Sequence, residues 1–224
     1  MSDNTRSYLH ALYGFDATVS RVGSQDWDSA SPCEGWSARD VLSHNIGMCQ
    51  MITGIAHGIG AESAGQPEVV DPLEEWGRAF AETRAALDDV EALSQKVQTP
   101  WGHLAVDRFV GIVTVDPLIH TFDLAVATGQ EVVIDPGLAD AGYIQLQKAG
   151  DMIRGERFGP EIELHGDKSI VEMLIAMAGR DPLMASELAT KTGSSPRSGP
   201  GCGFGFNTQA TSRFGWSLRS RVGI

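Results

Sequence analysis

The chain has 224 residues, of which 42% are hydrophobic and 21% are charged, so it can bury a sizeable core and wholesale disorder is excluded. Its net charge of −12 repels phosphate backbones, which argues against nucleic-acid binding as the main role. We expect no signal peptide and no apolar run long enough to span a bilayer. Three cysteines without a CxxC pair do not form a disulfide scaffold and favour a reducing cytoplasm, so we expect a cytoplasmic protein.

Charge divides the chain into two parts. Residues 186–224 hold five basic residues and one acidic residue, a net of +4, whereas residues 1–185 carry a net of −16. The C-terminal part is rich in Gly and Ser and lacks the apolar periodicity that would offset the entropy of ordering it. We expect residues 1–185 to fold as one domain and residues 186–224 to form a basic, disordered tail. A solvated extension is the favoured interpretation of this tail over a binding site for an acidic partner.

The first half of the domain predicts three helices. Apolar residues at a helical period predict a first helix over residues 5–22. Ser37 and Asp40 have the spacing of a capping box and open a second helix, which the glycine-rich stretch GIAHGIGAESAGQP closes. Asp71 before Pro72 is the start signal of a third helix, expected to run to about residue 93.

The second half continues the pattern. TPWGHLAV predicts an extended segment with a turn at Gly102, and the apolar residues 106–128 predict a fourth helix that ends at Gly129. A fifth helix is expected over residues 136–153 and a short sixth over residues 169–178. Five or six helices with one extended element predict an all-α bundle. Because bundles place ligand and metal sites in their cores, polar residues on apolar helix faces are the candidates for a site.

Asp116, His120 and Asp123 form such a polar stripe in VTVDPLIHTFDLAVATG. Their spacing puts them within about 40° of one another on one helix face. Charged groups on so apolar a helix are costly unless they are paired or bound to a metal. Asp116 and His120 suit a two-ligand clamp for a first-row metal, although an ordinary hydrogen bond on the helix surface is the more frequent meaning of this spacing. Asp123 is a fourth ligand, a group that orients an imidazole, or a purely structural acceptor.

His44 lies among apolar residues of the second helix, in SPCEGWSARDVLSHNIG. A lone histidine in such a place is usually a core residue with satisfied hydrogen bonds. Together with Asp116 and His120, however, it would supply a third ligand from a facing helix, and three N/O ligands are typical of reactive rather than structural zinc sites. Cys33, in the loop before this helix, is more simply interpreted as a packed thiol than as a ligand or redox group.

These segments resemble a known family. SPCEGWSARDVLSHNIG is similar to the Pro-Cys-x-x-Trp-(seven residues)-His segment of the mycothiol-dependent maleylpyruvate isomerase N-terminal domain family, whose relatives are the DinB/YfiT-like metalloenzymes. TPWG followed by DPLIHTFDLAVATG resembles the later block of the family, and GRDP at residues 179–182 resembles its usual ending, particularly in the actinobacterial subgroup described as metal-binding. The resemblance covers about residues 5–185.

The resemblance implies a DinB-like bundle of four antiparallel helices, with extra short helices, and a divalent metal ion, zinc, held by His44, Asp116 and His120. It also implies a small-molecule substrate and a thiol cofactor, mycothiol, which the metal activates as thiolate for a transfer or isomerisation. The alternative is a metal- or ligand-binding bundle without turnover. Nucleic-acid and membrane partners are not expected.

Two residues depart from the family pattern. Pro117 directly follows the expected ligand Asp116, so either the helix is kinked at the metal or Asp116 is displaced. Phe122 stands where the family has Trp, which keeps the aromatic bulk and removes an N–H donor. Four other histidines, His10, His57, His103 and His165, lack a partner at ligand spacing and are expected at the surface or in caps.

Overall fold

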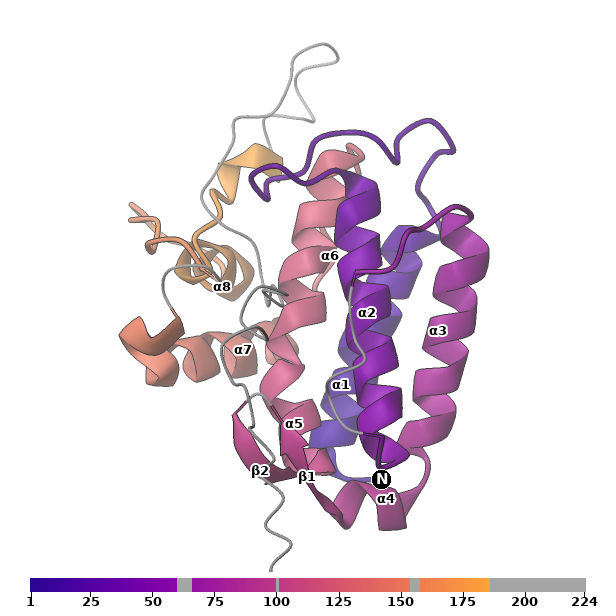
Figure 1. Cartoon of the computed structure of the whole chain (residues 1–224). Helices are drawn as coiled ribbons and strands as arrows, with labels where there is room; N and C mark the ends of the chain where they lie inside the picture. The colour runs from indigo at the N-terminus through magenta and orange to yellow at the C-terminus, as the bar shows by residue number, and fades with distance from the viewer. Residues whose placement is uncertain (60–65, 100, 154–157, 186–224) are drawn as a thin grey trace, which may run out of the picture.

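The structure is a computed structural model that describes residues 1–59, 66–99, 101–153 and 158–185 (Figure 1). The expected basic tail, residues 186–224, lies outside the described residues. Over the described ranges, the protein consists of α-helices, one short 3₁₀ helix and a single two-stranded hairpin. The all-α, DinB-like class expected from the sequence is therefore confirmed.

Four helical columns form the bundle around one apolar core. They are α1 (Asp3–Val19), α2 (Ala38–Ala56), α3 (Pro72–Leu87) and a column made of α5 (Val106–Val113) and α6 (Val115–Ala127). Asn4 near the start of α1 bonds to Asp107 near the start of α5 (2.9 Å), so these two columns run in the same direction. The Trp76 indole near the start of α3 donates to Asp16 near the end of α1 (2.8 Å), so α3 is antiparallel to α1. Figure 1 shows α2 running with α3.

The start signals of the helices act as predicted. Ser37 and Asp40 form the reciprocal capping box of α2, and Asp71 caps α3 by accepting from the backbone of Glu74. The first helix begins earlier than expected, at Asp3, because the Ser2 side chain accepts from a backbone N–H of its first turn. It also ends earlier, at Val19 instead of residue 22.

The expected third helix over residues 72–93 is in fact two helices. α3 ends at Leu87, and the short α4 (Val90–Ser94) begins after it. Asp89 causes the second start, because its side chain accepts hydrogen bonds from the backbone N–H groups of Glu91 and Ala92. The extended segment expected over TPWGHLAV is part of an antiparallel hairpin of β1 (Lys96–Thr99) and β2 (Gly102–Ala105). The first strand begins before the expected segment, and Gly102 is the first residue of β2. Gly102 has a φ of +94°, which favours glycine.

The expected fourth helix over residues 106–128 is interrupted at Thr114, which separates α5 from α6. Pro117 explains the interruption, because a proline ring collides with the carbonyl four residues earlier, here that of Val113. Pro117 is thereby the third residue of α6, in the first turn, where a helix leaves backbone N–H groups unpaired in any case. The break therefore accommodates the proline without an internal hydrogen bond being lost.

A helical unit outside the bundle packs on α6. It consists of α7 (Pro136–Ala149), the 3₁₀ helix η2 (Gly150–Ile153) and α8 (Ile170–Met177). The expected fifth helix thus ends as an α-helix at Ala149, because Gly150 adopts a φ of +53°. The sixth helix is confirmed, with a capping box of Ser169 and Glu172 at its start. In Figure 1 this unit lies to one side of the bundle, with α8 next to α6.

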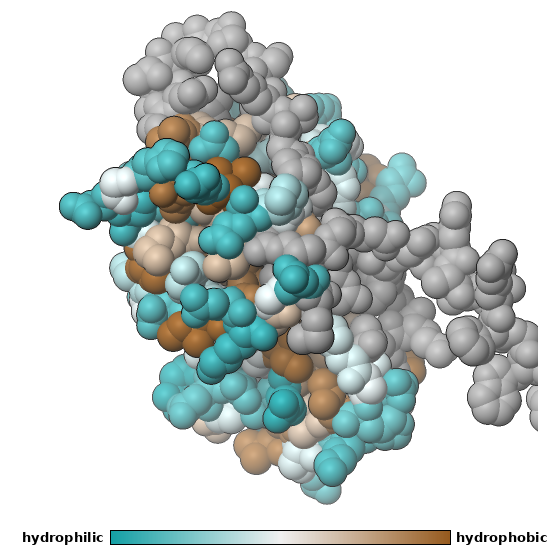
Figure 2. Space-filling view, turned by 90° about the vertical axis from the view of Figure 1, so that its left-hand side faces the viewer, coloured by the Kyte–Doolittle hydropathy of each residue, from teal (hydrophilic) through white to brown (hydrophobic). Residues whose placement is uncertain are grey.

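The stretch Val106–Ala127 corrects one expectation, because it is long and apolar enough to cross a membrane. However, 83% of its most apolar part is buried within the protein, so packing in the bundle accounts for its composition. On the face drawn in Figure 2, which carries α7 and α8, hydrophobic residues are scattered among hydrophilic ones and form no continuous band over the described residues.

Candidate metal centre

The three expected ligands meet in the centre of the bundle. His44 comes from α2, and Asp116 and His120 come from consecutive turns of α6. Nε2 of His44 lies 3.1 Å and 3.3 Å from the two carboxylate oxygens of Asp116, and Nε2 of His120 lies 3.6 Å from Oδ1. The candidate ligand atoms of the three residues all lie within 4.8 Å of one another. The structure thus brings together residues that are 72 positions apart in the sequence.

All three side chains are buried, with exposed fractions of 3%, 1% and 0% for His44, Asp116 and His120. Nε2 of His120 is buried without any hydrogen-bond partner, which is unusual for a polar atom in a protein core. It faces Asp116 at a distance too long for a hydrogen bond. Two imidazole nitrogens and a carboxylate oxygen around one point are a donor set that suits a divalent first-row metal, so the residues present fit such an ion.

Asp123 determines which nitrogen of His120 faces this point. Oδ2 of Asp123 lies 3.0 Å from Nδ1 of His120, on the other side of the ring from Asp116. Oδ2 and Oδ1 of Asp123 also accept hydrogen bonds from Nη2 (3.2 Å) and Nε (3.4 Å) of Arg180. An ionised carboxylate only accepts hydrogen bonds, so Nδ1 is the donor and the lone pair of neutral His120 is on Nε2. Of the three roles left open for Asp123, the geometry favours orientation of an imidazole.

The charges in this cluster lower the pKa values of its two aspartates and raise the pKa of His120. Burial by itself raises the pKa of Asp116, but the adjacent His44 and His120 outweigh it and hold that pKa well below its ordinary value. Burial lowers the pKa of His120, but the negative charge of Asp116, together with the charge of Asp123 and the hydrogen bond to it, raises that pKa to about 9. Burial by itself would also raise the pKa of Asp123, but the charges and hydrogen bonds of Arg180 and His120 outweigh it and lower that pKa below its ordinary value. A positive charge at His120 is therefore strongly favoured by the protein groups alone.

Trp36 forms one wall of the centre. Its ring lies parallel to that of His120, with centroids 6.0 Å apart and an interplanar angle of 17°, and its centroid is 5.4 Å from that of His44. Contact with both imidazoles makes Trp36 a structural part of the centre, because an indole against the rings restricts their rotation and excludes water.

Cys33, His120 and Asp123 form a second set whose candidate ligand atoms lie within 4.8 Å of one another. The sulfur of Cys33 lies 3.1 Å from Oδ2 of Asp123 and 3.4 Å from Nη2 of Arg180. In this set Nδ1 of His120 and the carboxylate of Asp123 already bond to each other, and the guanidinium of Arg180 occupies the remaining side. It is a less suitable cation site than the set around Asp116.

Arg180 is a buried charged residue of this cluster that the sequence analysis did not identify. Arg78, Arg84 and Arg108 are exposed, and Arg154 lies outside the described residues. Arg180 is only 2% exposed. The sequence feature that indicates its burial is GRDP, where an arginine directly follows an apolar helix and a glycine.

The four histidines expected at the surface or in caps are exposed, and His57 is the C-cap of α2.

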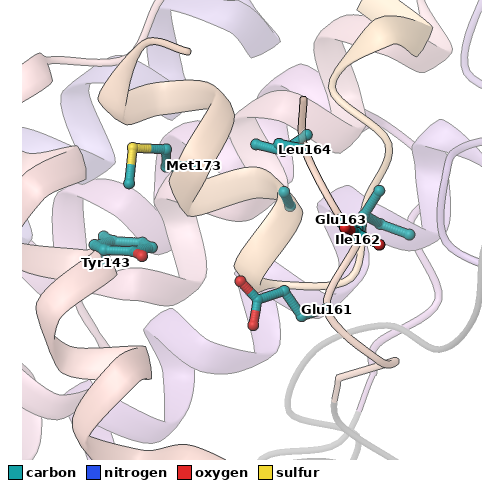
Figure 3. Close-up of a pocket in the computed structure, with 7 residues that line it drawn as sticks. Tyr143, Glu161, Ile162, Glu163, Leu164 and Met173 are labelled. Carbon is teal, nitrogen blue, oxygen red and sulfur yellow. The ribbon is translucent and has the colours of Figure 1, made fainter. Parts of the chain in front are cut away.

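A separate hollow of about 440 Å³ lies between α7, α8 and the segment 161–164 (Figure 3). Its lining combines apolar side chains with two exposed glutamates: Tyr143, Glu161, Ile162, Glu163, Leu164, Met173 and Ala176. None of the residues around Asp116 lines it, so it is distinct from the candidate metal centre.

The geometry around Pro117 yields a prediction. Asp116 contacts His44 at 3.1 Å although Pro117 follows it, because the helix break at Thr114 absorbs the proline. We therefore expect Pro117→Leu to change zinc affinity by less than a factor of about three, below 1 kcal/mol. Competition with a chromophoric zinc chelator measures this. A tighter Pro117→Leu variant would mean instead that the proline displaces Asp116 from its best position.

Comparison with known proteins identifies the family of the chain. Residues 9–125, more than half of the chain, match the family described as the mycothiol maleylpyruvate isomerase N-terminal domain. Uncharacterised proteins from two strains of Mycobacterium tuberculosis are 27% identical over 181 residues, which covers 80% of this chain and 98% of theirs. No solved structure matches the chain significantly. The matched range contains all three candidate ligands and extends from within α1 to within α6. The chain belongs to the mycothiol maleylpyruvate isomerase N-terminal domain family.

Proposed function

We propose that this protein binds one divalent metal ion, zinc, through His44, Asp116 and His120, and uses it in the cytoplasm to activate a low-molecular-weight thiol, mycothiol, for transfer to or isomerisation of a small electrophilic substrate. The observation that carries the metal proposal is the unpartnered Nε2 of His120, buried and facing Asp116. Membership of the family supports the thiol part of the proposal.

Each residue of the centre would have a different role at such a metal site. With an ion bound, His44 and His120 would be the imidazole donors, and Asp116 would be the anionic donor. Asp123 keeps the proton of His120 on Nδ1, and Trp36 shields the imidazoles from water. When bound, a divalent ion supplies Lewis acidity that lowers the pKa of a thiol and stabilises the thiolate. A set of three protein ligands is the number that reactive zinc sites use.

One observation favours a second function, a metal- or ligand-binding bundle without turnover. The three ligands are at most 3% exposed, whereas a thiol cofactor has to reach the ion. The two functions make different predictions for a thiol added to the metal-loaded protein, and the same preparation tests both.

The first experiment is metal analysis of full-length protein purified without chelators, followed by thermal unfolding with added zinc. We expect about one zinc ion per chain. Zinc at 100 times its Kd should stabilise the protein by about 2.7 kcal/mol, which for a domain of this size raises the Tm by roughly 5–10 °C. His10→Ala, which removes an exposed histidine, is the matched control and should behave as the wild type. Protein with no metal and no change in Tm would show that the cluster is a hydrogen-bond network without an ion.

The second experiment adds mycothiol to protein in which cobalt replaces zinc. A thiolate on the metal should produce a sulfur-to-metal charge-transfer band in the near ultraviolet, and the Tm should rise further. A loaded protein that gives neither signal binds metal without thiol chemistry, which is the second function.

A further inference from the structure

Gly179 and Arg180 carry the chain from the end of α8 into the bundle core. Gly179 adopts a φ of +81°, and a Cβ atom on it would lie 3.1 Å from the backbone of Gly159. Only glycine fits both requirements. This turn directs Arg180 inward, to 2% exposure, although arginine is among the residues least often buried.

Two of the contacts that Arg180 makes in the core determine how its guanidinium is oriented toward Asp123. Nη1 donates to the carbonyl of Ala178 at 2.8 Å, at the C-terminal end of α8, where a cation is favoured. Nε and Nη2 contact both carboxylate oxygens of Asp123, at 3.4 Å and 3.2 Å. A planar guanidinium with two contacts fixes the plane of a carboxylate as well as its charge. Asp123 is fully buried and would be costly without such a partner.

Asp123 in turn holds His120. With its carboxylate fixed by Arg180, Oδ2 of Asp123 is presented to Nδ1 of His120 at 3.0 Å. If Asp123 were free to rotate or to take up a proton, the imidazole could carry its proton on Nε2 instead. That tautomer has no lone pair toward Asp116 and His44 and cannot bind a metal there.

We propose that Arg180 is a positioning residue of the metal centre: it holds Asp123 so that Nε2 of His120 remains directed toward the position between His44 and Asp116. This inference rests on the proposed metal binding. It extends the centre beyond the bundle, because Arg180 lies after α8 and outside residues 9–125, which match the family. The packing of α8 on α6 thereby affects metal affinity.

A purely electrostatic role of Arg180 predicts the opposite effect. A buried guanidinium repels a nearby divalent cation, so its removal would tighten metal binding. Positioning predicts that removal weakens binding, and the sign of the change separates the two roles.

The test measures zinc affinity and the cobalt absorption spectrum of Arg180→Gln in the full-length chain. We expect about a 10- to 100-fold loss of affinity, the usual effect of removing a group that orients a ligand, together with a changed cobalt spectrum. Arg180→Lys keeps the charge but not the two-point contact, so its affinity should lie between those of Arg180→Gln and the wild type. Arg84→Gln, which removes an exposed arginine, is the matched control.

A double-mutant cycle tests whether Arg180 acts through Asp123. Asp123→Asn should weaken binding to a similar extent, and the double variant should lose little more than Asp123→Asn alone. In the zinc-loaded protein, long-range ¹H–¹⁵N correlation spectra should show the His120 proton on Nδ1 in the wild type. This readout does not depend on activity or stability.

The outcomes separate the two proposals. Wild-type protein that binds no zinc overturns the proposed function and this inference with it. Wild-type protein that binds zinc, with equal or tighter binding by folded Arg180→Gln or with additive losses in the cycle, overturns the inference alone. If Arg180→Gln does not fold, Arg180→Lys provides the measurement, and wild-type affinity in that variant contradicts the positioning role.

Discussion

Alanine in place of either His44 or His120 should abolish stoichiometric zinc binding. Each change removes one of two imidazole donors from a buried site and leaves one imidazole with one carboxylate, fewer protein ligands than zinc sites use. Asp116→Ala should weaken binding without abolishing it, because both imidazoles remain. Metal content after dialysis and competition with a chelator measure these effects, and His10→Ala again serves as the control.

The same three variants should differ in stability when no zinc is added. Asp116→Ala leaves the positive charge favoured at His120 with only one of its two adjacent carboxylates, that of Asp123, in a fully buried position. Breaking a buried pair from one side costs about 3–5 kcal/mol, so this variant should unfold at clearly lower denaturant concentration. His44→Ala should cost less, since Asp116 keeps His120 as a partner. Equal stability of all three variants would contradict the charge distribution described for the cluster.

The second large effect is a pH dependence that zinc removes. The folded-state pKa of His120, about 9, lies above its ordinary value near 6.5. A raised pKa stabilises the folded state fully below pH 6.5, and this contribution disappears as the pH rises through 9. Protein without zinc should therefore lose on the order of 3 kcal/mol of stability between pH 6.5 and pH 9.5 from this group. Denaturant titrations across that range measure it.

Zinc competes with the proton on His120, because only neutral imidazole binds a metal. Zinc binding at pH 7 should release about one proton from His120, and the apparent affinity should rise about tenfold per pH unit between pH 6 and 8. Calorimetry in buffers of different ionisation enthalpy counts the released protons. Binding without proton release would show that His120 is neutral before zinc arrives.

Asp116 makes a separate contribution at acid pH. Because its folded-state pKa is lowered, its ionised carboxylate stabilises the folded state at pH values above the ordinary pKa of an aspartate. This stabilisation is lost as the pH falls through the folded-state pKa.

Much of the helical architecture follows from local signals. The capping box at Ser37, the Asp-Pro start at Asp71 and the glycine after α6 act within a few residues, so the sequence shows them directly. Errors arose where two local signals compete. Asp89 restarts a helix that the apolar pattern would continue, and Pro117 divides one apolar stretch into α5 and α6.

The sequence by itself determined the three candidate ligands, because the polar stripe of Asp116 and His120 lies on an apolar helix and His44 lies in a segment that resembles the family. Tertiary structure alone decided how they are supported. Arg180 reaches Asp123 from 57 positions away, and the orphan Nε2 of His120 exists only because α2 and α6 exclude water around it. Helix periodicity specifies which residues share a face, but contacts between distant segments depend on packing, which no local pattern encodes.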